Sequence, residues 1–113
     1  MITCRDQQSH SVREFMRGGK KQVELTQLSA KLPEKMRMFN VLRLIPGASI
    51  GYHEHEGETE MFYFLEGNCR VQDDDRFYDI SAGDSMATFS GHGHSVENTG
   101  DNDLVILAAI VRD

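Results

Sequence analysis

The chain has 113 residues, which is enough for one domain with a single modest core and too few for two. Eighteen acidic against twelve basic side chains give a formal net charge of −6, which excludes a general electrostatic surface for nucleic acid. No apolar run approaches the roughly 18 residues that a membrane span needs, so we expect no membrane partner.

The cysteine content and the first residues of the chain indicate in which cellular compartment the protein is expected. Two cysteines are too few for a disulfide framework, and Cys4 lies near the terminus, so Cys4 and Cys69 are expected to be free thiols. The opening residues, Met1-Ile2-Thr3, do not resemble a secretory signal peptide. We therefore expect a cytoplasmic protein.

The basic residues are concentrated in the first part of the chain. Residues 1–43 carry nine Lys or Arg and four Asp or Glu, whereas residues 44–113 carry three and fourteen. We interpret residues 1–21, which are mostly polar, as an N-terminal arm. Such an arm would gain electrostatically by packing on its own acidic domain or on that of a partner.

Only one short apolar cluster interrupts the arm. The helical spacing of Val12, Phe15 and Met16 predicts one helical turn, which Gly18-Gly19 would end.

Residues 22–113 form the predicted domain, and its pattern indicates β-strands throughout. Short apolar or alternating segments are separated by glycine, proline and aspartate turns, and no helix is required after residue 21. The expected strands are 22–28, 38–45, two strands flanking residues 53–60, then 69–72, 76–80, 85–89, a segment near 92–98, and 104–111. Short strands at regular spacing are typical of an all-β barrel or sandwich.

Three potential metal ligands lie close together between Gly47 and Gly67. His53 and His55 are two residues apart in an extended run, so their side chains project from the same face, roughly 7 Å apart at the backbone. Glu60 follows a polar segment whose glycine permits a sharp reversal, so its carboxylate can return from a neighbouring strand. Two imidazoles and a carboxylate are a ligand set for a divalent first-row metal.

Strand parity makes a second prediction for the strand that contains Glu60. If Glu60 points inward, Phe62 and Phe64 do so too, because alternate residues share a face. The outward-facing side chains would then be Met61, Tyr63 and Leu65. That outer face is too apolar to be left in water, so we expect a second subunit to cover part of it in a homodimer.

These spacings resemble the two sequence motifs of the cupin superfamily. In the first motif, a glycine is followed after five residues by His-x-His, after four more by Glu, and after six more by a second glycine. Its positions are held by Gly47, His53, His55, Glu60 and Gly67. The second is a glycine, five residues, Pro-x-Gly, two residues, His, three residues and Asn. Gly83, Gly91, His94 and Asn98 match it, and Phe89 stands in place of the proline.

The resemblance implies a single-domain, all-β, cupin-type jelly-roll β-barrel. It also implies that the metal ligands are His53, His55, Glu60 and His94. The residues alone indicated three of these four, and a fourth imidazole from a distant strand is what facing strands of a barrel can supply. Phe89 leaves the ligand set unchanged, and either lines a ligand pocket or packs outward.

Other residues are candidates for the pocket around the metal. Inward-facing Phe62 and Phe64 would form an apolar wall, and Met38, Leu42 and Met86 are further wall candidates by parity. Arg43 is either an anchor for a carboxylate or phosphate or a solvent-facing side chain. Tyr52 and His92 are nominal acid or base candidates beside the ligands, but the sequence identifies no catalytic residue.

Three imidazoles and a carboxylate suit manganese, iron, nickel, cobalt, copper or zinc, and the three nitrogens disfavour magnesium and calcium. The first functional hypothesis is an enzyme that uses this metal on a small oxygenated molecule, as a dioxygenase, decarboxylase, isomerase or lyase. The alternative is a non-catalytic module that binds or senses a small ligand through the metal. A structural or storage role is a weaker third possibility.

Overall fold

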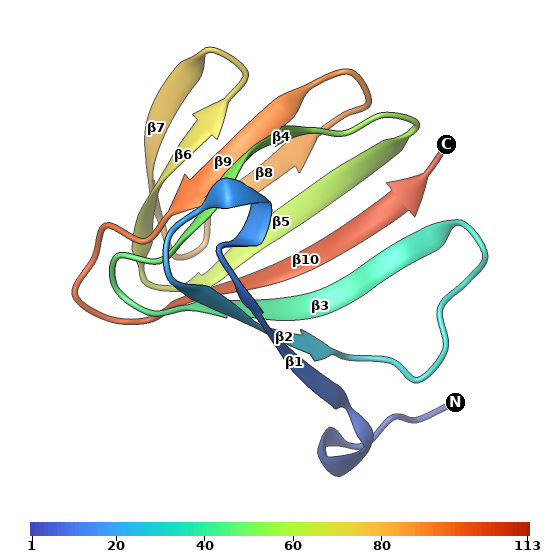
Figure 1. Ribbon diagram of the computed structural model, residues 1–113. Coiled ribbons are helices and arrows are strands. Elements are labelled where there is room, and N and C mark those ends of the chain that lie inside the picture. The colour runs from blue at the N-terminus through green and yellow to red at the C-terminus, as the bar shows by residue number, and fades with distance from the viewer.

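The computed structural model describes residues 1–113 and shows ten strands in two sheets that face each other (Figure 1). The larger sheet has the order β1 (Ser9–Glu14), β2 (Gln22–Gln27), β3 (Met36–Leu44), β10 (Leu104–Arg112), β5 (Glu58–Glu66) and β8 (Ser85–Thr88). The smaller sheet has the order β4 (Ser49–Glu54), β9 (Gly93–Glu97), β6 (Asn68–Asp73) and β7 (Arg76–Ser81). Two short 3₁₀ turns, η1 (Arg5–Gln7) and η2 (Met16–Gly18), flank β1.

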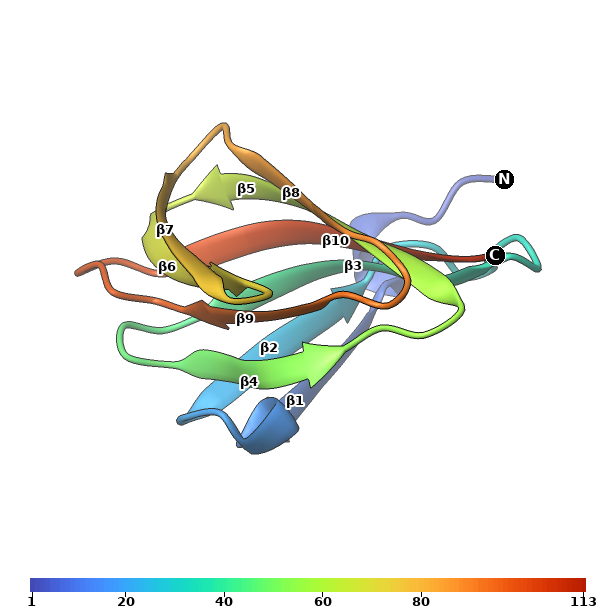
Figure 2. The ribbon, with the colours of Figure 1, turned by 90° about the horizontal axis from the view of Figure 1, so that it is seen from above.

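The arrangement confirms the predicted all-β jelly roll. The strands are hydrogen-bonded within each sheet and not around one continuous ring, and Figure 2 shows β9 and β4 of the smaller sheet on the other side of the view from β5 and β8 of the larger one. The interior is therefore the space between two sheets, to which both contribute alternate side chains. No helix in the structure has the length and apolar character needed to cross a membrane.

The alternation of side chains on β5 confirms the parity prediction. Glu60, Phe62 and Phe64 are buried between the sheets. Their neighbours Met61, Tyr63 and Leu65 point the other way and are 41–46% exposed. Because β5 is paired with β10 on one side and β8 on the other, its inward side chains are held near the middle of the interior.

The N-terminal segment differs from its predicted helical turn. Val12 lies in β1, which pairs antiparallel with β2, and the 3₁₀ turn covers Met16–Gly18 alone. An extended segment beside β2 can form a ladder of backbone hydrogen bonds, whereas an isolated helical turn of three or four residues is only marginally stable. The division into an arm of residues 1–21 and a domain of residues 22–113 stays a prediction.

Both cysteines are free, as predicted from the sequence. Cys4 is exposed, and Cys69 is buried on β6. Burial raises the pKa of the Cys69 thiol to about 12, so this side chain is an uncharged part of the core at neutral pH.

Asn98 connects the end of β9 to two other parts of the fold. Its side-chain amide donates to the carbonyl oxygens of Leu44 at 2.8 Å and Asn102 at 2.9 Å, and its Oδ1 accepts from the Gly100 amide at 3.0 Å. The side chain is 1% exposed, so water cannot replace these bonds without structural change.

We therefore expect Asn98→Ala to lower the free energy of unfolding by about 2–3 kcal/mol, because buried backbone groups lose their partners. Asn102→Ala is the matched control. Its exposed side chain is not needed for the Asn98 bond, so its effect should stay within about 0.5 kcal/mol. Urea denaturation measures both values, and equal losses in the two variants would contradict this account.

The outer face of the larger sheet carries a continuous apolar surface. In the strand register, Leu107 lies between Val41 and Tyr63, and Ala109 lies between Phe39 and Met61. These side chains share one face of β3, β10 and β5, away from the interior. We call this the outer apolar face, and we propose, as predicted from the sequence, that a second copy of the chain covers it.

Light scattering should then give a mass of twice the 12.8 kDa of one chain. Tyr63→Glu places a charge on the outer apolar face and should shift the mass to that of a monomer. Tyr78→Glu on the other sheet is a control of equal exposure, because both tyrosines are 45% exposed, and it should leave the dimer intact. A monomeric wild-type protein would contradict the proposal.

Candidate metal site

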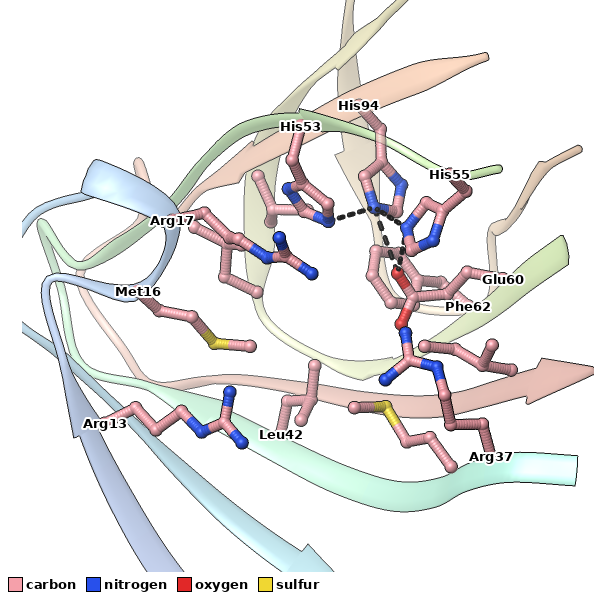
Figure 3. Close-up of a pocket in the computed structure, with 14 residues that line it drawn as sticks. Arg13, Met16, Arg17, Arg37, Leu42, His53, His55, Glu60, Phe62 and His94 are labelled. Carbon is pink, nitrogen blue, oxygen red and sulfur yellow. Dashed lines mark hydrogen bonds and ion pairs between the residues drawn. The ribbon is translucent and has the colours of Figure 1, made fainter. Parts of the chain in front are cut away.

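Four side chains from three parts of the fold meet in the interior. His53 on β4 and His94 on β9 are directly opposite in the strand register, and His55 follows the end of β4. Glu60 comes from β5 in the facing sheet. Figure 3 shows the three rings and the carboxylate pointing toward one another, and we call these four side chains the donor cluster.

The donor atoms are close enough to share one ion. Nε2 of His94 lies 3.1 Å from Nε2 of His55 and 3.2 Å from Nε2 of His53. Oε1 of Glu60 lies 3.1 Å from Nε2 of His55 and 3.0 Å from Nε2 of His94. One ligand atom from each residue lies within 4.8 Å of all the others, so the group is able to hold a metal ion.

The other ring nitrogens are bonded to groups outside the cluster. Nδ1 of His53 bonds to the carbonyl oxygen of Gly51 at 2.8 Å, and Nδ1 of His55 bonds to Oε2 of Glu58 at 2.7 Å. Both partners can only accept, so these Nδ1 atoms donate, and each Nε2 is left with a lone pair directed at the cluster. Nδ1 of His94 bonds at 2.7 Å to the hydroxyl of Thr88, which can also accept.

This donor set fits a divalent transition metal. Lone pairs and an ionised carboxylate converge on one point at which His55, His94 and Glu60 are buried, so they repel one another unless a cation or a proton lies between them. Three nitrogens and one oxygen suit the first-row metals, and hydrogen bonds to the outer nitrogens are typical of metal-binding histidines.

The electrostatics of the cluster are consistent with this fit. Burial lowers the pKa of His53, which keeps its ring neutral, and the positive charge of Arg17 acts in the same direction. A hydrogen bond to Glu60 raises the pKa of His55, so a proton can compete for this position. Burial raises the pKa of the Glu60 carboxyl, but the hydrogen bonds that His55 and His94 would donate when protonated at Nε2 outweigh it, and the net direction is downward.

Glu58 links the donor cluster to the wall of the cavity. Nε and Nη2 of Arg37 donate to its two carboxylate oxygens at 2.9 and 2.7 Å, while Oε2 also accepts from His55. The paired Arg37 guanidinium lowers the pKa of Glu58 to about 2, so the carboxylate stays charged at all ordinary pH values. Glu58 thereby fixes the orientation of the His55 ring.

A cavity of about 60 Å³ opens beside the donor cluster. Of the predicted wall residues, Phe62, Met38 and Leu42 line it, and the Phe62 ring stacks on His94 at a centroid distance of 5.1 Å. Phe64 and Met86 are buried but lie outside the cavity lining. The wall is therefore apolar near the donor cluster, as expected for a small-molecule site.

Four further candidates from the sequence do not line this cavity. Arg43 forms an ion pair with Asp103 at 3.3 Å on the surface. Phe89 is 59% exposed, so its side chain packs outward. His92 is exposed and bonds to Asp74, which raises the pKa of His92. Tyr52 lies against Gly93 and is also exposed. Tyr52 precedes His53 in a strand, so the two side chains project from opposite faces.

The sequence analysis missed three arginines that line the cavity, namely Arg13, Arg17 and Arg37 (Figure 3). Arg13 and Arg17 come from the N-terminal segment, which the charge distribution predicted to pack on an acidic domain without indicating where. Arg37 is the second residue of β3, and its ion pair with Glu58 joins residues 21 positions apart. Only the excess of basic residues before residue 44 pointed toward these side chains.

Comparisons with known proteins agree with this fold. The family model of the cupin domain matches residues 40–110. The oxalate-binding protein of Thermotoga maritima is 46% identical over 98 residues, which are 85% of this chain and 81% of that protein.

Two solved structures illustrate the range of similarity. The crystal structure of a predicted oxalate decarboxylase from Thermotoga maritima matches all of both chains with a TM-score of 0.93 and 40% identity. KdgF from a Halomonas species matches all of this chain and 96% of its own with a TM-score of 0.75 and 18% identity, a similarity of fold alone.

The hydrogen bond from His55 to Glu58 orients one ring of the donor cluster. Glu58→Gln weakens the hydrogen bond that orients His55, so we expect metal affinity to fall about 10–100-fold in competition with a chromophoric chelator. Glu56→Gln, an exposed position in the same loop, should bind metal as wild type does. Equal affinities for the two variants would show that Glu58 does not support the site.

Proposed function

This chain belongs to the cupin family, and we propose that it binds oxalate, or a dicarboxylate of similar size, at a divalent transition metal. The ligands of that metal would be the donor cluster, His53, His55, Glu60 and His94. Manganese, iron, cobalt, nickel, copper and zinc all suit three imidazoles and a carboxylate, so the proposal covers this group of metals.

One observation carries the proposal, which is that the donor cluster and three arginines border the same small cavity. Arginine presents a planar fork of donors that matches a carboxylate, and it keeps its charge at every ordinary pH. A metal bound by the donor cluster would supply positive charge and open coordination positions for carboxylate oxygens. Both features favour a small ligand that carries more than one negative charge.

The apolar part of the wall favours a short ligand. Phe62, Leu42 and Ile110 surround the cavity and offer no hydrogen bonds to a long polar chain. A compact dicarboxylate can direct its oxygens at the metal and the arginines while its carbon atoms contact the apolar wall. The 46% identical relative from Thermotoga maritima is an oxalate-binding protein, which supports oxalate as the first candidate.

A second candidate function is the decarboxylation of the bound dicarboxylate, in line with the sequence-based hypothesis of a metal-dependent enzyme. The 40% identical structure from Thermotoga maritima, that of a predicted oxalate decarboxylase, favours this possibility. In oxalate decarboxylation the bond between the two carbons breaks, carbon dioxide leaves, and a proton is added to the remaining carbon to give formate. Formate release is therefore the measurement that separates an enzyme from a binding module.

We expect the purified protein to contain stoichiometric transition metal and to bind oxalate in isothermal titration calorimetry. Removal of the metal with a chelator should abolish oxalate binding, and adding the metal back should restore it. The double variant His53→Ala/His94→Ala should lose the metal and the oxalate binding together. Assay of formate in the same samples decides between the two candidate functions.

The matched control removes two histidines outside the donor cluster. His10 and His92 are exposed and bond to Thr26 and Asp74, respectively, so His10→Ala/His92→Ala should retain the metal and bind oxalate. If His53→Ala/His94→Ala carries as much metal as this control, the proposed site is wrong. If the metal-loaded protein fails to bind oxalate, the proposed ligand is wrong.

A further inference from the structure

Two arginines of the N-terminal segment lie at the cavity with no partner of their own. Arg13 on β1 and Arg17 in η2 line the cavity, and Figure 3 shows both guanidinium groups turned toward it. Arg37, the third arginine there, is bound to Glu58. Arg13 and Arg17 make no ion pair and no side-chain hydrogen bond, so their donors remain available to a ligand.

The backbone around Arg17 is held in an unusual conformation. The backbone of Arg17 has left-handed dihedral angles, with φ 55° and ψ 31°. This conformation costs a non-glycine residue on the order of 1 kcal/mol or more. The turn lies directly on β4, where a Cβ added to Gly51 would be 2.0 Å from the carbonyl oxygen of Arg17. A side chain at Gly19 would likewise clash with the Ser49 carbonyl oxygen, at 2.2 Å.

Hydrogen bonds fix the turn at the same place. The Ser49 amide donates to the carbonyl oxygen of Lys20 at 2.9 Å, and the Lys20 amide donates to the Ser49 hydroxyl at 2.8 Å. Two glycines and these two bonds therefore hold η2 against β4, the strand that carries His53. Arg17 is thus held in a fixed position relative to the donor cluster.

The charges around the cavity define the ligand it would suit. A divalent ion would be half neutralised by Glu60, and Glu58 neutralises Arg37. One positive charge is then left at the metal, and Arg13 and Arg17 add two more. A singly charged ligand would leave most of this positive charge uncompensated, whereas a dianion would balance most of it.

We propose that Arg13 and Arg17 are ligand-binding residues that select doubly charged over singly charged ligands. The inference rests on the proposed function, because it takes the cavity to be the site of a small dicarboxylate bound beside the metal. The donor cluster would bind the ligand from one side, and the guanidinium groups would bind carboxylate oxygens from the other. Selectivity then resides in the N-terminal segment.

Oxalate and oxamate form a matched pair of probes, because oxamate has nearly the same shape but replaces one carboxylate with a neutral amide. Isothermal titration calorimetry of the metal-loaded wild type should show oxalate binding about tenfold or more tightly than oxamate. Arg13→Gln/Arg17→Gln should weaken oxalate binding about 10–100-fold and change oxamate binding much less. The metal content should not change, since neither arginine belongs to the donor cluster.

Arg5→Gln is the control, because Arg5 is an exposed arginine of the same segment that does not line the cavity. Arg17→Lys keeps the charge but removes the planar fork, so its oxalate affinity should fall between those of wild type and Arg17→Gln.

Three outcomes would overturn the inference. If the double variant contains metal and binds oxalate as tightly as Arg5→Gln does, Arg13 and Arg17 do not bind the ligand, and oxalate binding depends on the metal and the rest of the cavity. If oxalate and oxamate binding weaken equally, the arginines do not select charge. If the metal-loaded wild type binds neither probe, the proposed function fails and the inference fails with it.

Discussion

The structure depends on the convergence of three imidazole nitrogens and one carboxylate oxygen in a buried space. Hydrogen bonds from the outer ring nitrogens to Gly51 and Glu58 direct the lone pairs of two histidines inward, where they meet the carboxylate of Glu60. Such an arrangement is unfavourable without a positive charge at its centre, because donors with lone pairs repel one another in a medium of low dielectric constant. The fold therefore concentrates electron-pair donors at one point and surrounds that point with side chains that exclude water.

The two-sheet architecture makes this convergence possible. His53 and His94 are opposite each other on neighbouring strands of one sheet, and Glu60 approaches from the other sheet. Phe62 on β5 and Val96 on β9 lie two residues from Glu60 and His94 and belong to the apolar core, so the polar cluster and the core are parts of one interior. His94 lies at the start of β9, and Asn98 directly follows its last residue. The Asn98 side chain bonds there to Leu44, the last residue of β3. One end of β9 therefore contributes His94 to the donor cluster, and the residue after its other end holds the strand to β3.

The strands, three members of the donor cluster and the apolar part of the cavity wall were predictable from local patterns, His94 was predictable from the resemblance to a family, and the arginines of the wall were not predictable. His53, His55 and Glu60 follow from strand parity and a glycine turn, and His94 follows from motif spacing. Arg13 and Arg17 could not be placed, because their contact with the cavity depends on β1 pairing at the sheet edge and on η2 packing against β4. Tyr52 and His92 lie close in sequence to members of the donor cluster but outside the cavity lining. Tyr52 precedes His53 in β4 and therefore faces the opposite side, and His92 lies in the turn before β9, where strand parity does not apply, so proximity in the sequence did not predict a place in the cavity for either.

The close backbone contact between η2 and β4 has an evolutionary consequence. The donor cluster lies between residues 53 and 94, whereas the turn against β4 belongs to the first 20 residues. A lineage that keeps a glycine at position 51 keeps room for a main-chain turn at the mouth of the site, whatever side chains that turn carries. Substitutions in β1 and η2 can therefore change what borders the cavity while the donor cluster stays the same.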